Sequence, residues 1–186
     1  MFMFGNQDLC KRNKKGFTLI EVIIALLVLT VAIFGVYGAF SSMVVATNQT
    51  TDRFVAAYLA QEGIELVRNL RDQNWILDRE WNYELEGCES DSQGCQTDYE
   101  NKILDAYGSY LNIDSRGFYV YDPGAAVTPT KIKRKINIDP IIRNGESLPY
   151  AIKVTATVFW DQKKSFANPE GKQGSITAED YLYNWY

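Results

Sequence analysis

A single acid in an apolar run is the residue whose type and position most demand a chemical explanation. Glu21 is the only charged residue between Phe17 and Phe40, and the run is otherwise apolar except for Thr18 and Thr30. A carboxylate near the middle of a membrane-spanning helix costs about 2.5–3.5 kcal/mol on insertion scales. We therefore expect a group nearby that neutralises Glu21.

The run that holds Glu21 is long enough to cross a membrane. As an α-helix with a rise of ~1.5 Å per residue it extends over roughly 36 Å, against about 30 Å for a hydrocarbon core. Basic residues precede the run, and no Lys or Arg follows it until Arg53. This asymmetry predicts a single-pass protein of the cytoplasmic (inner) membrane with its amino terminus inside and everything from about Ser41 onward outside.

Three kinds of amino-terminal segment share this apolar character. A secretory signal has an apolar core of roughly 7–15 residues followed by a small-residue cleavage site; here the core is longer and no clean A-x-A follows it. A plain membrane anchor explains the length and the charges but leaves Glu21 without a partner. The third kind is a leader that is cut off before the apolar run.

The string Lys14-Lys15-Gly16-Phe17-Thr18-Leu19-Ile20-Glu21 resembles the processing site of type IV prepilins. In that family a basic leader ends in Gly and is followed by an aromatic residue and by an acid at the fifth mature position. The resemblance implies cleavage between Gly16 and Phe17 by a cytoplasm-facing prepilin peptidase, and N-methylation of Phe17. It also implies that the partners are other pilin or pseudopilin subunits in a cell-surface or periplasmic filament.

Cleavage at this position would supply the group that Glu21 needs. The cut precedes the apolar run, so the helix is retained and gains a terminal amine with an unperturbed pKa near 8. That amine and Glu21 are four residues apart, which places them on one face of a helix. We expect Glu21 to pair with its own amine or with that of a neighbouring subunit; in the family the second pairing is thought to set axial register during assembly.

The helix is expected to continue beyond the membrane to about Asp72. Val55, Leu59, Leu66 and Leu70 are spaced so that they form an apolar stripe on one face of this helix, with polar residues around it. Such a stripe indicates packing against another element. In pilins the outer half of this helix packs on a β-sheet head. The resemblance thus implies an α+β fold with a leader at 1–16, a transmembrane half-helix at 17–44, an amphipathic half at 45–74 and an extracytoplasmic β-rich head at 75–186.

Two features of the helix favour a minor subunit over a major one. Major pilins often carry a proline near the position of Gly38, and this chain has none there. The segment from Leu59 to Arg68 is similar to that of a subset of minor pilins and type II secretion minor pseudopilins, which carry Leu-Ala, a Glu and an Arg here. Gly35 and Gly38 each cost about 1 kcal/mol relative to Ala in a helix, and they permit either bending or close packing against neighbouring helices.

Cys88 and Cys95 form an even pair once Cys10 leaves with the leader. Outside the cytoplasm disulfides persist, so a bridge between the two is expected.

A structural zinc needs about four N or S ligands, and the chain has no histidine and no further cysteine. Calcium takes oxygen ligands, and five acids lie near the two cysteines: Glu86, Glu89, Asp91, Asp98 and Glu100. Their spacing is not that of an EF-hand, so we interpret them as a solvated acidic loop rather than a calcium site.

The last third of the chain reads as antiparallel sheet. Strands are expected at Phe118–Tyr121, at Ile132–Ile138, at Tyr150–Trp160 and from about Ser175 to Trp185, because these stretches are β-rich or alternate between apolar and polar residues. The pair formed by Val154–Asp161 and Tyr181–Trp185 again resembles the minor pilins. The basic stretch Lys131–Lys135 is interpreted as the solvated face of a strand.

Composition excludes several other functions. Residues 1–16 carry a net charge of +3 and the rest of the chain −7, so nothing predicts nucleic-acid binding, which needs clustered Lys and Arg. Without histidine, Ser-His and Cys-His catalysis and histidine-ligated metals are ruled out, and no phosphate-binding loop is present. We predict a structural subunit without cofactor or metal.

The alternative is a membrane-tethered binding protein that never polymerises and presents an aromatic surface made of Trp75, Trp81, Tyr83, Tyr99, Tyr107 and Tyr110.

Overall fold

A single long helix and a β-sheet make up the computed structural model, which describes residues 16–121, 128–143, 149–162, 171 and 173–185. The helix α1 spans Leu19–Ile76. The chain divides within this helix into two compact units, residues 1–44 and residues 45–186. This α+β architecture, an amino-terminal helix followed by an antiparallel sheet, is the one that the sequence predicts; most of the leader, residues 1–15, lies outside the described residues.

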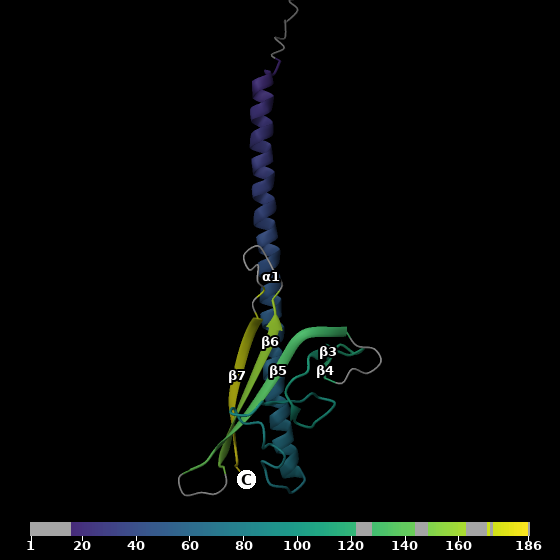
Figure 1. The fold of residues 1–186 in the computed structure, drawn as a ribbon, viewed down its shortest axis with the longest axis vertical. Coiled ribbons are helices and arrows are strands. Elements are labelled where there is room, and N and C mark those ends of the chain that lie inside the picture. Colours follow the sequence, from purple (N-terminus) through teal and green to yellow (C-terminus); the bar gives the residue numbers. More distant parts are fainter. Residues whose placement is uncertain (1–15, 122–127, 144–148, 163–170, 172, 186) are drawn as a thin grey trace, which may run out of the picture. The chain divides into compact units, whose positions relative to one another are not determined.

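The sheet of the second unit is dominated by three long antiparallel strands, β5 (Thr128–Ile141), β6 (Ala151–Asp161) and β7 (Gln173–Tyr183). Figure 1 shows them side by side, with β6 in the middle. Four short strands extend the sheet beyond β5: β1 (Cys95–Gln96), β2 (Asp105–Ala106), β3 (Leu111–Ile113) and β4 (Tyr119–Val120). In the described part of the chain β1 and β3 both pair with β5, while β2 pairs with β1 and β4 with β3.

Alternation along β6 fixes which face of the sheet is buried. Ile152, Val154, Ala156, Val158 and Trp160 are buried, and the intervening Lys153, Thr155 and Thr157 are half-buried on the other face, as the sequence pattern predicts. The register with β7 runs without a break from Ala151 opposite Tyr183 to Asp161 opposite Gln173. Opposite Trp160 stands Gly174, where a Cβ atom would lie 2.3 Å from Trp160 Cε2. Only glycine leaves room for the indole there.

The second half of α1 supplies the other side of the core. Its buried residues are Ala56, Leu59, Ala60, Gly63, Ile64, Val67, Arg71 and Asn74. The predicted stripe of Val55, Leu59, Leu66 and Leu70 packs on the core in part: Leu59 is buried, and Val55 and Leu70 are half-buried against the core. The centre of the buried line lies beside it, at Ala56, Ala60, Gly63 and Val67. Three of these residues are small, Ala56, Ala60 and Gly63, and at Gly63 the sheet approaches so closely that a Cβ atom would lie 3.3 Å from Ala156 Cβ.

The helix also ends later than predicted. It continues past Asp72 to Ile76, since Arg71 and Asn74 are buried and the Asn74 side-chain amide donates to the carbonyls of Trp81 and Tyr83. Asp78, with a φ of 55°, then turns the chain away. The amide thus ties the last helical turn to the loop that follows.

Candidate processing and assembly site

The helix begins two residues after the predicted cleavage position. Gly16, Phe17 and Thr18 precede α1 in a non-helical conformation. Thr18 Oγ1 accepts a hydrogen bond from Glu21 N–H at 3.4 Å, and the Thr18 carbonyl accepts one from Val22 N–H at 3.3 Å. Thr18 is therefore the N-cap of α1, and the order Thr-x-x-Glu is that of a capping box. The expectation that Phe17 opens the helix is corrected by this cap.

Glu21 lies in the first turn of the helix. A negative charge there is favoured by the partial positive charge of the helix amino terminus, typically by 0.3–1 kcal/mol. Glu21 also lies near the end of the apolar run. Insertion of its carboxylate into a membrane there costs less than the roughly 2.5–3.5 kcal/mol that applies at the helix centre. The helix terminus is therefore a favourable place for the Glu21 carboxylate, and pairing with the Phe17 amine remains a prediction for a processed chain.

The first half of α1 makes no buried contact within the described chain. Every residue from Gly16 to Val44 is exposed, including large apolar side chains throughout the run. A Cβ atom at Gly35 or Gly38 would meet no described heavy atom within 4 Å. The helix is long and apolar enough in this half to cross a membrane. Among the described residues nothing packs on either glycine.

A buried arginine links the second half of α1 to the sheet. Arg134 is fully buried, and its guanidinium donates to the carbonyls of Leu59 at 3.0 Å and Thr97 at 2.6 Å. One guanidinium nitrogen is also 3.4 Å from the Glu62 carboxylate. The prediction that Lys131–Lys135 is a solvated face is wrong at this residue, because Arg134 shares the inward face with Ile132 and Ile136.

The surroundings of Arg134 are closely packed. A Cβ atom at Gly63 would lie 3.0 Å from Arg134 Cδ and 3.3 Å from Ala156 Cβ, so glycine allows the arginine to pass beside the helix. The Tyr121 hydroxyl donates to the Arg134 carbonyl at 3.0 Å, and burial raises the pKa of Tyr121 to about 12. Tyr121 therefore stays a neutral hydrogen-bond donor at physiological pH.

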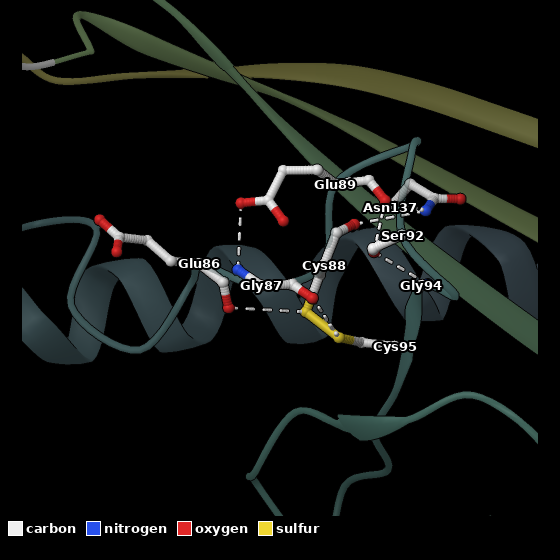
Figure 2. Close-up of a disulfide and its surroundings, with 8 residues drawn as sticks. All are labelled: Glu86, Gly87, Cys88, Glu89, Ser92, Gly94, Cys95 and Asn137. Carbon is white, nitrogen blue, oxygen red and sulfur yellow. Dashed lines mark hydrogen bonds between the residues drawn. A yellow bond between two sulfur atoms is a disulfide. The ribbon is translucent and has the colours of Figure 1, made fainter.

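Cys88 and Cys95, predicted to be bridged, form a disulfide (Figure 2). Both are buried, and the loop that they close is held on β5 by Asn137, whose side-chain amide donates to the carbonyls of Cys88 at 3.3 Å and Glu89 at 3.0 Å. Closing a loop of this length contributes roughly 2.5 kcal/mol in the chain-entropy model. The disulfide thus stabilises the loop that it closes in the head.

Several acids considered for calcium form hydrogen bonds to the backbone instead. Asp98 is buried and accepts from the N–H groups of Glu100, Asn101 and Tyr121, and Glu89 accepts from Gly87 N–H. Among the described residues no group of three or more His, Cys, Asp or Glu side chains is placed to hold a metal ion. These carboxylates organise loops of the head.

The aromatic residues considered for a binding surface enter different contacts. Trp81 is buried in the core, and the Trp75 ring packs edge-on against Trp185 with centroids 4.8 Å apart. Tyr99 contacts Phe118, with centroids 5.1 Å apart, while the Lys133 ammonium lies 4.4 Å from the centroid of Tyr110 and 5.9 Å from that of Tyr107. Tyr107 and Tyr110 thus share a contact with Lys133, whereas Trp81 belongs to the core.

Comparison with known families finds a match to the prokaryotic N-terminal methylation motif at residues 11–37. The match includes Gly16, Phe17, the cap Thr18 and Glu21, and it supports a type IV pilin-like prepilin. No curated protein and no solved structure matches the chain. The likeness therefore rests on the amino-terminal motif, the exposed apolar helix and the α+β fold taken together.

Two residues of structural weight were not singled out from the sequence. Thr18 was noted only as a polar interruption, although Thr and Glu three residues apart before an apolar run are a recognisable helix start. Arg134 was grouped with its neighbouring lysines, although the period of a strand assigns it to the face of Ile132 and Ile136. Local patterns could have found both.

Proposed function

We propose that this chain is a structural subunit of a type IV pilus or a type II secretion-like filament, as a minor pilin or pseudopilin. Prepilin peptidase cuts between Gly16 and Phe17, Phe17 is N-methylated, and the retained helix anchors the subunit in the membrane before assembly. The observation that carries the proposal is the methylation motif at residues 11–37 on a helix whose first half is apolar and exposed. The pilin-like α+β fold supports it.

Glu21 is proposed to act in assembly, by pairing with the Phe17 amine of the same or a neighbouring subunit. The minor role is supported by the absence of a proline near Gly38 and by the similarity of the Leu59–Arg68 segment to minor subunits. The head is proposed to lie outside the cytoplasm, in agreement with the disulfide between Cys88 and Cys95. Enzymatic activity forms no part of this proposal.

The test is mass spectrometry of the amino terminus of the protein made in its native cell. We expect a chain that begins at N-methylated Phe17, an accumulated precursor for Gly16→Ala, and a normally processed Glu21→Ala variant that no longer co-purifies with filaments. A wild-type protein that keeps residues 1–16 would contradict the proposal. A processed protein that never co-purifies with filaments would favour the tethered binding protein instead.

A further inference from the structure

The peptide bond that the proposed function requires to be cut lies just outside α1. Gly16 and Phe17 are non-helical and exposed, and the helical hydrogen bonds begin with the Thr18 carbonyl. The side chain that defines this start is that of Thr18, through its Oγ1 and the Glu21 N–H. The prokaryotic N-terminal methylation motif, matched at residues 11–37, covers these residues.

Without the Thr18 oxygen the next residue suited to cap the helix is Gly16, because glycine and threonine rank about equally as N-caps. A helix that starts there would place Phe17 at its first position, and the Gly16 carbonyl would accept the first helical hydrogen bond, from Ile20 N–H. The bond to be cut would then lie within the first turn. Proteolysis favours exposed, extended segments over hydrogen-bonded ones, so such a start would hinder cleavage.

We propose that Thr18 is a positioning residue for processing: its N-cap holds the start of α1 at Leu19 and so keeps the Gly16–Phe17 bond outside the helix, where the peptidase can reach it. This inference rests on the proposed function. Thr18 acts through the helix start rather than through the reacting atoms. Loss of an N-cap typically changes the helix equilibrium by about five-fold, and a similar change is expected in the cleavage rate.

The experiment measures initial cleavage rates of the full-length precursor in lipid vesicles with purified prepilin peptidase. Thr18→Val keeps the shape of the side chain and removes the oxygen, so we expect cleavage about five-fold slower. Thr18→Asn and Thr18→Ser keep a capping oxygen, so we expect rates within about two-fold of wild type. Thr30→Val makes the same change inside α1, where Thr30 Oγ1 donates to the Leu27 carbonyl, and should leave the rate unchanged.

The order of the variants separates capping from direct recognition. A peptidase that reads the shape of Thr18 would accept Val and reject Asn, which is the reverse of the order expected from capping. Equal rates for Val and Asn, or a faster Val variant, would overturn the inference.

A second measurement reports on the cap without requiring cleavage. Backbone ¹³C chemical shifts of Phe17 in the uncut precursor should move toward helical values in Thr18→Val and stay near wild type in Thr18→Asn. Unchanged shifts in Thr18→Val would overturn the capping argument even if processing occurs. A wild-type precursor that the peptidase leaves uncut while these shifts behave as expected would instead refute the proposed function.

Discussion

Residues 19–44 and residues 45–76 belong to one helix, yet only the second stretch buries side chains within the described chain. The first half is apolar on all sides, and the second half carries a buried line of small and apolar residues with polar residues elsewhere. A helix that is hydrophobic all round needs an apolar surrounding, whereas an amphipathic one needs a single partner. The first half therefore calls for an apolar surrounding that the described residues do not supply, whereas the second half packs on the sheet of its own unit.

The difference can be tested most strongly with one substitution in each region. Ile136→Ala removes a fully buried side chain from the core beneath the helix, so we expect the free energy of unfolding of the head to fall by about 2–5 kcal/mol. Ile33→Ala removes a 57% exposed side chain from the first half of α1, so the free energy of unfolding of the head should change by less than about 0.5 kcal/mol.

Denaturant unfolding of the full chain in detergent micelles measures this, with tryptophan fluorescence as the signal. All four tryptophans follow residue 74, so the signal reports the head alone. Equal losses for Ile136→Ala and Ile33→Ala would show that the first half of the helix is packed within the molecule after all.

A second comparison uses two glycines of the same helix. Gly63→Leu introduces a side chain where even a Cβ atom meets Arg134 and Ala156 within 3.3 Å, so overpacking should lower head stability by about 1–3 kcal/mol. Gly35→Leu introduces the same side chain into open space and should leave head stability unchanged. The same fluorescence assay measures both variants, and a destabilised Gly35→Leu head would contradict the comparison.

The smallest expected effect is a pH dependence confined to the head. Burial raises the pKa of Asp114, but hydrogen bonds from the Phe118 and Arg116 N–H groups, the Arg116 side chain and the Tyr99 hydroxyl outweigh it and lower that pKa from 3.8 to about 2. Because the folded pKa lies below the unfolded one, the stabilising contribution is complete above the unfolded pKa and is lost as pH falls through the folded one.

Thermal unfolding of the wild type and of Asp114→Asn, compared across this pH range, measures the contribution. The wild-type midpoint should fall more steeply than that of Asp114→Asn as pH drops from about 4 toward about 2, since only the wild type has this carboxylate to protonate. Parallel curves for the two proteins would show that Asp114 is not stabilised in this way.

The sequence predicted the elements better than their contacts. The span, the disulfide and the three long strands follow from local signals: an unbroken apolar run, an even pair of cysteines and alternation with a period of two. The buried line of α1 could not be predicted from local signals, because small residues such as Ala60 and Gly63 are only weakly hydrophobic. Their burial depends on how closely the sheet approaches the helix. Arg134 was misassigned for a related reason, since a charge is expected in water unless a partner is known.

By itself the sequence determined the amino-terminal motif and the apolar helix, because a membrane-length apolar run, a lone acid and a Gly-Phe junction depend only on residues adjacent in the chain. Only the tertiary structure decided which helix face meets the sheet and that Arg134 donates to the Leu59 and Thr97 carbonyls. Those contacts join residues far apart in sequence. Their energies depend on close packing and on the removal of water, which no local pattern records.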